Sequence, residues 1–348
     1  MMRIFLPLFF WAYFMTNVSG QQKANYTLRT VAFYNVENLF DVVDDSLTFD
    51  DSRTPEGRYR WSVDRYQHKI GNLAKVIAGI GSEISKESPD IIGLCEVENK
   101  AVLHDLISHS YLKEKNYGII HYESPDERGI DVALLYKKGV FVPRSFKSHR
   151  LLLFDIEGKR DYTRDQLVVS GTMDSETFHF IVNHWPSRSG GERRSRPYRI
   201  AAARLNYRIL DSLTKGHPKA KILSMGDFND DPIDDSMKKV LQIGIRNDSL
   251  APFRLYNPME ALYKKGEGSL AYRDRWNLFD QIFFSATLLH APETEHHFWK
   301  AGIYRPNFIR TPYGKYKGYP LRSFSGINYT AGYSDHFPVY IHLIKRAN

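Results

Sequence analysis

A series of short apolar segments rich in Val, Ile, Leu and Phe recurs along almost the whole chain, and this recurrence limits the folds that the chain can adopt. Segments of this length and composition are typical of central β-strands. They lie at residues 30–35, 91–97, 131–136, 166–173, 176–184, 221–225, 278–284 and 339–343. Apolar residues also recur every three or four positions over 66–84 and over 199–215, which predicts two amphipathic helices.

The order of these elements favours an α/β fold built from two packed sheets. Strands and helices are mixed without strict alternation, which argues against a barrel or a doubly wound sheet. Segments 131–136, 166–173 and 176–184 follow one another closely, so we expect them to pair as antiparallel neighbours. We therefore predict two mixed or antiparallel sheets packed face to face, with helices outside and long loops over 44–60 and 286–328.

The N-terminal segment 1–20 has the pattern of a secretory signal peptide. Arg3 precedes an apolar run from Ile4 to Met15, and Val18–Gly20 supplies the cleavage site. The apolar run is short for a bilayer and no later stretch is long enough, so we expect no stable membrane anchor; a retained N-terminal anchor is the alternative. The protein is accordingly expected to be secreted or periplasmic. No repeat or low-complexity linker divides residues 21–348, which we expect to form one domain.

Charge and cysteine content narrow the classes of function. Lys and Arg number 48 and Asp and Glu 40, a net charge of +8 that suits an anionic substrate but also a basic surface kept for solubility. Cys95 is the only cysteine and lies in an apolar run, so we expect it in the core, with no intramolecular disulfide and no role as a nucleophile. We predict no obligate protein partner.

Polar side chains recur where the apolar segments end, and this pattern points to chemistry. Carboxylates at strand ends can converge at one rim of a sheet, where buried negative charge is stable only beside a cation. Oxygen ligands without cysteine suit a hard ion, Mg²⁺ or Mn²⁺, better than zinc. One such residue is usually a turn or cap residue, but a set at successive strand ends is not explained that way. The set comprises Asn35, Glu96, His184, Asp227, Asn229, Asp280, Asp335 and His336.

Short motifs that contain these residues occur in the order of the endonuclease/exonuclease/phosphatase superfamily, the deoxyribonuclease I-like metal-dependent phosphoesterases. The motifs are Phe33-Tyr-Asn35-Val-Glu-Asn, Gly93-Leu-Cys-Glu96-Val, Asn183-His184-Trp-Pro-Ser, Gly226-Asp227-Phe-Asn229-Asp and Ser334-Asp335-His336. Each is weak alone, but together and in order they make the chain resemble this superfamily over about residues 28–345. The sequence around His184 is similar to secreted bacterial members described as nucleases. The resemblance implies a four-layer α/β sandwich with two central sheets and helices on the outer faces.

The resemblance also implies a metal centre and a histidine dyad. Glu96 is expected to be the principal ligand of Mg²⁺ or Mn²⁺, with Asn35 and Asp335 close to the ion or to its waters. His336 is expected to pair with Asp280, whose carboxylate would fix the imidazole tautomer and support its protonated form.

The resemblance implies that the remaining residues of these motifs act on the attacking water and on the phosphate. Asp227 would orient or deprotonate the water, and Asn229 would hold a phosphate oxygen or that nucleophile. His184 would donate a hydrogen bond to a phosphate oxygen, with Asp131 as its orienting partner.

These roles predict a Mg²⁺-dependent phosphoric ester hydrolase. The first expectation is an exported nuclease that hydrolyses phosphodiester bonds of nucleic acid by in-line attack of water. Arg128 and Arg188 flank the expected site and are candidate phosphate contacts, with a solvated surface as the alternative. The alternative function is a phosphatase or phosphodiesterase acting on a lipid headgroup, an inositol phosphate or a small nucleotide. A binding module that has kept the fold and lost catalysis is disfavoured, because the acidic residues and histidines are all present.

Overall fold

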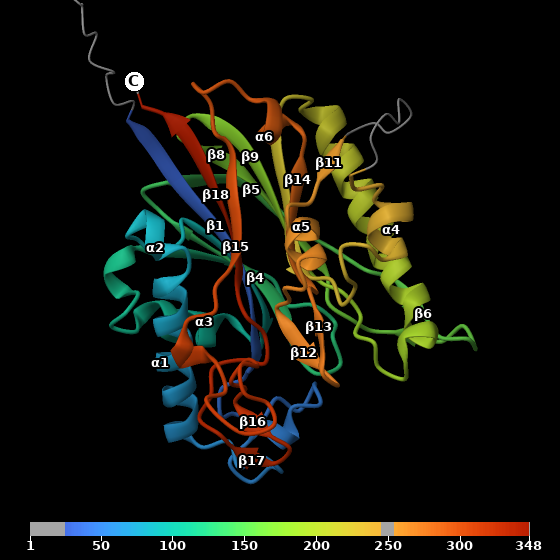
Figure 1. Cartoon of the computed structure of the whole chain (residues 1–348). Helices are drawn as coiled ribbons and strands as arrows, with labels where there is room; N and C mark the ends of the chain where they lie inside the picture. Colours follow the sequence, from blue (N-terminus) through green and yellow to red (C-terminus); the bar gives the residue numbers. More distant parts are fainter. Residues whose placement is uncertain (1–24, 245–253, 348) are drawn as a thin grey trace, which may run out of the picture.

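Two six-stranded β-sheets pack face to face and carry helices on their outer faces (Figure 1). This description comes from a computed structural model and covers residues 25–244 and 254–347. The predicted signal peptide at 1–20 lies outside the described residues. The order of layers is helix, sheet, sheet, helix, which confirms the predicted α/β sandwich.

The first sheet is built around the parallel pair β1 and β2, and its other strand pairs are antiparallel, in the order β15–β18–β1–β2–β4–β3. Its strands are β1 (Tyr26–Leu39), β2 (Ile91–Val97), β3 (Tyr117–His121), β4 (Asp131–Lys137), β15 (His297–Ile303) and β18 (Val339–Arg346). The helices beside it are α1 (Val63–Gly79), α2 (Ser82–Ser85) and α3 (Lys100–Ser108).

The second sheet is built around the parallel pair β9 and β10, in the order β11–β14–β10–β9–β8–β5. Its strands are β5 (Phe141–His149), β8 (Gln166–Met173), β9 (Glu176–His184), β10 (Lys221–Asp227), β11 (Leu255–Tyr256) and β14 (Asp280–Ser285). The helices near it are α4 (Glu192–Gly216), which covers the outer face, and the shorter α5 (Met259–Lys264) and α6 (Thr287–His290).

Short ribbons and single helical turns occupy the connections. The ribbons pair β6 (Leu153–Phe154) with β7 (Arg160–Asp161), β12 (Leu270–Tyr272) with β13 (Arg275–Asn277), and β16 (Phe324–Ser325) with β17 (Asn328–Tyr329). The helical turns lie at Asp51–Arg53, Lys113–Lys115, Ser236–Val240 and Asn307–Ile309. Within the described ranges, no helix has both the length and the apolar character needed to cross a membrane.

The largest apolar contacts lie between the two sheets and under the helices. Phe33 and Phe180 are buried in the layer between the sheets, as the alternation of their strands requires. A Cβ atom at Gly93 would lie only 2.7 Å from Met225 Sδ, so glycine at this position lets β2 lie close to β10. This close packing brings the ends of the two sheets together at the rim described below.

Helix α1 matches the predicted amphipathic pattern over most of its length. The Ser62 side chain caps its N-terminus, and Tyr66, Ile70 and Ile77 are buried against the first sheet. The predicted helix over 66–84 is interrupted after Gly79, where Gly81 has a φ of 71° and the chain restarts as α2.

Two predictions about the sheets are wrong. The segment 131–136 does not pair with β8: it forms β4, in the first sheet between β2 and β3. The antiparallel partner of β8 besides β9 is β5, and the predicted loop over 286–328 contains β15, which pairs with β18. Strands β5 and β15 are sheet edges with mostly exposed or half-buried residues, so they lack the apolar run that marks a central strand.

A partly buried group of charges around the buried His296 ties the two sheets together at the end where β1 begins. The imidazole of His296 lies between two carboxylates, with Nε2 at 3.1 Å from Asp174 Oδ2 and Nδ1 at 3.0 Å from Glu176 Oε1. Burial alone would lower the pKa of His296, but the hydrogen bonds and charges of the two carboxylates raise it overall. The cations that contact the same carboxylates are Arg29, Lys221 and Lys345.

We expect this histidine to make stability depend on pH. A group whose pKa is raised by folding stabilises the protein below its unfolded pKa, about 6.5 for histidine, and this contribution is lost as pH rises through the folded pKa. The free energy of unfolding of the wild type should therefore fall from pH 6 to pH 9 relative to that of His296→Gln. Urea unfolding of both proteins across this range measures the difference. A difference that stays constant with pH would contradict the prediction.

Candidate active site

The strands that carry the predicted site residues end at one rim of the sandwich. Asn35 lies in β1 of the first sheet and Asp227 ends β10 of the second. The Nδ2 atom of Asn35 donates a hydrogen bond of 3.1 Å to Asp227 Oδ2, so the two sheets meet here. The parallel partners of these strands bring Glu96 of β2 and His184 of β9 to the same rim.

Glu96 reaches the rim through a β-bulge. The register of β2 against β4 shifts between Cys95 and Val97, and Glu96 has a φ of 62°, which is unusual for a residue other than glycine. The extra residue turns the Glu96 carboxylate into the space between the sheets. There its Oε1 lies 3.4 Å from Asn35 Nδ2, and its Oε2 accepts a hydrogen bond of 2.9 Å from the Asn38 amide.

Asp227 is the central side chain of the second sheet at this rim. It lies beside His184 on β9 and beside Asp280 on β14. The His184 Nε2 atom is 3.8 Å from Asp227 Oδ2 and 3.8 Å from Glu96 Oε1. Burial raises the pKa of Asp227 to about 7, with the charge of His336 opposing that effect. Asp227 can therefore take up or release a proton near neutral pH.

His336 and Asp280 form the expected dyad. His336 Nδ1 lies 2.6 Å from Asp280 Oδ2, and the Ser269 hydroxyl donates to the same oxygen at 2.5 Å. Burial alone would lower the pKa of His336, but the charge and hydrogen bond of Asp280 raise it well above its usual value. The imidazole is therefore protonated at neutral pH and presents Nε2 toward Asp227, 3.9 Å away.

The expected pairing of His184 with Asp131 is wrong. Asp131 Oδ2 lies 3.0 Å from the Nε2 atom of His121, and it is this histidine that Asp131 orients. The Nδ1 atom of His184 is buried and has no hydrogen-bond partner within the described ranges. Burial, with the nearby positive charges of Arg164 and Arg128, holds the pKa of His184 well below its usual value, so this imidazole is neutral.

Asp335 belongs to an ion-pair network that the sequence did not reveal. Its Oδ2 accepts from Arg322 at 2.7 Å, and its Oδ1 lies 4.0 Å from His336 Nε2. Arg322 also lies 3.6 Å from Glu37, whose other oxygen is 3.7 Å from the buried ammonium of Lys69. Burial lowers the pKa of Lys69 to about 8. The sequence signal for this network is Lys69, a charged residue among the apolar positions of the predicted helix over 66–84.

A second missed network holds the chain that follows His184. The buried guanidinium of Arg164 donates 2.9 Å hydrogen bonds to Asp126 Oδ2 and to the carbonyl oxygen of Trp185. Asn229 Nδ2 donates to the same carbonyl at 3.0 Å, and its backbone amide donates to Asp227 at 3.0 Å. These bonds fix the end of β9 relative to the end of β10.

We expect Arg164→Lys to lower kcat/KM by up to about 10²-fold, the effect typical of a small displacement of reacting groups. A lysine ammonium lacks the planar fork needed to bond Asp126 and the Trp185 carbonyl together. Steady-state kinetics with a thermal melt checks the prediction. Arg150→Lys, at a side chain that is 58% exposed, is the matched control. Equal rates for the two variants would show that the fork does not position His184.

The two arginines predicted as phosphate contacts have different surroundings. Arg188 Nε donates to the carbonyl oxygen of Asn229 at 2.8 Å, and its Nη2 lies 2.7 Å from Asp234. Arg128 is more exposed, with its Nε 3.9 Å from Asp126. Arg188 therefore lies directly beside the predicted site residue Asn229, while the positive charge of Arg128 acts on His184.

A groove of about 1550 Å³ opens beside Asp335 and His336. The long segment between β15 and β18 lines one part of it, and the β12–β13 ribbon lines another. Its cationic lining residues are Arg188, Arg273, Arg275, Lys315 and Arg322. Its aromatic lining residues include Tyr272, Trp276, Tyr316 and Tyr319.

The donor atoms at the rim fit a hard divalent ion. Mg²⁺ binds through one or two carboxylates and keeps several waters, and Glu96 with Asp335 supplies such carboxylates. The Oδ1 atom of Asn35 accepts a hydrogen bond from the Glu37 amide at 2.9 Å, while its Nδ2 donates to Glu96 and Asp227. Asn35 therefore contacts both carboxylates through its amide nitrogen, and its position beside the ion or its waters stays a prediction.

Comparison with known proteins connects this geometry to a family. The model of the Endonuclease/Exonuclease/phosphatase family matches residues 30–345. A comparison with curated proteins finds no significant match.

Solved structures share the same fold at low sequence identity. An endonuclease/exonuclease/phosphatase family protein from Bacteroides thetaiotaomicron is 18% identical with a TM-score of 0.53, over 93% of this chain and 97% of that chain. The mannosyl-6-phosphatase Bt3783 from the same species is 20% identical with a TM-score of 0.51, over 90% and 99%. A humanized TDP2 from D. rerio is 13% identical with a TM-score of 0.53, over 91% and 98%.

Proposed function

Because this chain belongs to the endonuclease/exonuclease/phosphatase family of phosphoester hydrolases, we propose that it is an exported Mg²⁺-dependent nuclease. The observation that carries the proposal is the cationic and aromatic groove beside His336 and Asp335. Its volume of about 1550 Å³ exceeds the roughly 300–1,000 Å³ typical of small-molecule pockets. Cationic side chains follow a phosphate backbone, and aromatic rings stack on bases.

The side chains at the rim suit hydrolysis of a phosphodiester. A bound Mg²⁺ would shield the charge of the phosphate and of the leaving oxygen, and Glu96 and Asp335 would hold it. Asp227 accepts a proton from the attacking water, since its pKa of about 7 allows it to exchange protons near neutral pH. The protonated His336, fixed by Asp280, places a positive charge next to the phosphate oxygens.

The orientation of the neutral His184 supports the same reaction. Its Nε2 atom faces the space between Glu96 and Asp227, where the phosphate must lie to meet the water. Asn229 is held beside Asp227 and lies close enough to orient either the water or a phosphate oxygen. We include export in the proposal because of the leader pattern at 1–20.

A phosphatase or phosphodiesterase for a lipid headgroup, an inositol phosphate or a small nucleotide is the second candidate. The groove also contains the carboxylates Glu192, Asp231, Asp234 and Asp274, which repel a polyanion and can accept hydrogen bonds from hydroxyl groups. Arg188 is already paired with Asp234, so part of the positive charge is neutralised. These contacts favour a smaller, hydroxyl-rich substrate.

Substrate profiling separates the two candidates. Purified protein with Mg²⁺ is incubated with supercoiled DNA, RNA and a panel of phosphomonoesters, with EDTA as the blank. We expect nicking or shortening of nucleic acid that Glu96→Gln, at limiting Mg²⁺, and His336→Asn strongly reduce. Phosphate release from small esters with intact nucleic acid would keep the site and transfer the function to the second candidate.

Groove variants test where nucleic acid binds. We expect Arg273→Ala combined with Lys315→Ala to raise KM for nucleic acid and to reduce its dependence on salt, because two phosphate contacts are lost. Lys219→Ala, an exposed lysine at the opposite end of the second sheet, is the control. Unchanged KM and salt dependence in the double variant would exclude the groove as the path of the polymer.

A further inference from the structure

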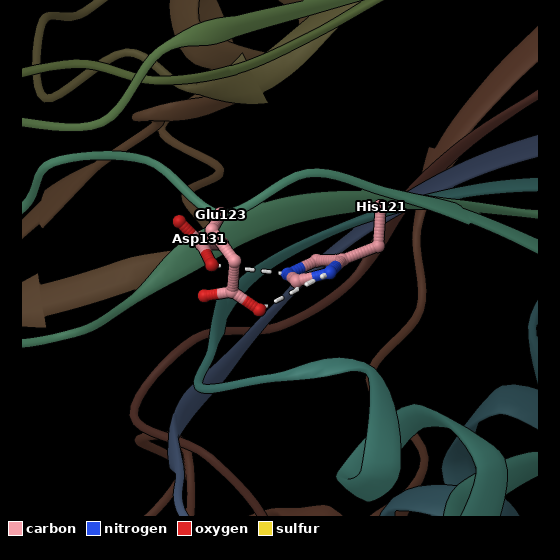
Figure 2. A group of neighbouring side chains, drawn as sticks. All are labelled: His121, Glu123 and Asp131. Atoms are coloured by element: carbon pink, nitrogen blue, oxygen red, sulfur yellow. Dashed lines mark hydrogen bonds and ion pairs between the residues drawn. The ribbon is translucent and has the colours of Figure 1, made fainter. Parts of the chain in front are cut away.

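Three side chains converge where β3 ends and β4 begins, with Asp131 paired to Val97 at the same end of the first sheet as Glu96 (Figure 2). His121 ends β3, Asp131 begins β4, and Glu123 lies in the connection between them. His121 Nε2 is 3.0 Å from Asp131 Oδ2, and His121 Nδ1 is 3.9 Å from Glu123 Oε1. One ligand atom of each residue lies within 4.8 Å of the other two, as in a metal site.

The alternation of β4 separates this group from the catalytic rim. Ala133 and Leu135 face the helix-covered side of the sheet, whereas Val132 and Leu134 face the space between the sheets. Asp131 lies two residues before Ala133 in the strand and therefore on the same face, so its carboxylate is on the outer side of the sheet. An ion bound by Asp131 would therefore be distinct from an ion bound by Glu96.

Two of the three side chains are held in place, and the third faces solvent. The Oδ1 atom of Asp131 accepts hydrogen bonds from the Ser124 amide at 2.8 Å and from the Ser124 hydroxyl at 2.5 Å, which leaves Oδ2 directed at His121. The side chains of His121 and Asp131 are 3% and 2% exposed, but that of Glu123 is 73% exposed. The group thus combines a rigid pair of ligands with an open side through which an ion can enter.

The negative charge of this group has no fixed counter-ion in the described part of the chain. No Lys or Arg there forms an ion pair with Asp131 or Glu123; His121 is their one basic partner. Asp131 and Asp45 both place negative charge near Glu123. Two carboxylates are therefore held close together at a place where a cation would relieve their repulsion.

We propose that His121, Glu123 and Asp131 form a second divalent-metal site, selective for a Zn²⁺-like transition-metal ion over Mg²⁺. One imidazole nitrogen with two carboxylate oxygens is a donor set for such ions, whereas Mg²⁺ prefers oxygen ligands alone. Water would fill the remaining positions on the side of Glu123.

Binding here would also act on the catalytic rim through the 122–130 connection. This segment carries Asp126, which accepts from Arg164 at 2.9 Å, and Arg164 in turn holds the carbonyl of Trp185. An ion bound by both Glu123 and Asp131 would hold the start of this connection to the residue that follows its end. The site is therefore a stabilising one for the loop next to His184, and it takes no part in the chemical step.

Metal titration in a background that lacks the principal catalytic ligand tests the site. The full protein carrying Glu96→Gln is titrated with Co²⁺ alone, followed by visible absorption, and with Zn²⁺ alone, followed by calorimetry and thermal melting. We expect one Zn²⁺ per chain, a rise in Tm, and the strong visible absorption of Co²⁺ in a four- or five-coordinate site with a nitrogen ligand. Mg²⁺ should produce no shift of Tm through this site.

Matched variants assign the binding to the three residues. Adding Glu123→Gln should weaken Zn²⁺ binding at least about tenfold, while Glu127→Gln, an exposed carboxylate in the same connection, should leave it unchanged. Glu123 is exposed, so its variant keeps the fold even if His121→Ala does not. Absence of binding in the Glu96→Gln protein, or equal binding by both glutamine variants, would overturn the proposal and leave His121 as an ordinary ion-pair partner. Neither result bears on the nuclease proposal.

Discussion

Replacing His336 with asparagine is expected to lower kcat by about 10²–10⁴-fold, the contribution typical of a positioned acid or base. Asparagine can still donate a hydrogen bond to Asp280, but it cannot carry the positive charge that this carboxylate stabilises on the imidazole. The loss should appear in kcat with little change in KM, because the charge matters most when negative charge builds up on the phosphate oxygens.

Kinetics at saturating substrate, with a thermal melt of each protein, measures this effect. His104→Asn, at an exposed position of α3, is the matched control and should retain full activity. Asp280→Asn should reproduce most of the loss, since it removes the partner that raises the pKa of His336. If His336→Asn retained activity while folding normally, the dyad would have to be regarded as a structural contact.

Glu96→Gln is expected to have the second large effect, a fall of about 10²–10³-fold in activity at limiting Mg²⁺. The substitution removes one negative charge but preserves the shape of the side chain and its ability to accept from the Asn38 amide. The loss should be partly rescued by excess Mg²⁺ or Mn²⁺, because a weakened site is filled by mass action. Activity measured against metal concentration shows whether the apparent Kd for the ion has risen.

Glu98, two residues after Glu96, provides the control for this prediction. Burial chiefly raises the pKa of Glu98 to about 8, with the charge of Asp41 adding to it. A carboxyl with this pKa is mostly protonated at pH 7, and glutamine closely resembles the protonated form. Glu98→Gln should therefore leave the metal dependence unchanged. An equal loss in both variants would show that the ion is not bound specifically by Glu96.

Most of the candidate site could be predicted because its residues lie where apolar strands end. Asn35, Glu96, His184 and Asp227 each follow a buried run, and parallel strands of one sheet carry such residues to a common edge. The side chains that contact these residues could not be predicted from the sequence in the same way. Ser269, Lys69 and Arg164 approach from loops and from a helix, where no short-range pattern predicts what a side chain will meet.

Asp131 shows how a correctly chosen residue can be given the wrong partner. It begins a strand next to the site, as the sequence indicates, but the alternation of β4 directs its carboxylate to the outer side of the sheet and to His121. The one-residue bulge at Glu96 has the opposite effect and turns its carboxylate inward. Both outcomes depend on which face of the sheet a residue occupies, and a shift by one residue reverses that face.

The sequence by itself determined the strands of the sandwich interior, the amphipathic helix α1 and the residue types at the catalytic rim. It could do so because burial of central strands and of one helix face demands local, periodic apolar patterns. Only the tertiary structure decided the edge strands β5 and β15, the sheet to which β4 belongs and the carboxylate that each histidine meets. These depend on contacts between segments far apart in the chain, whose energies come from packing and charge in three dimensions and leave no periodic trace in the sequence.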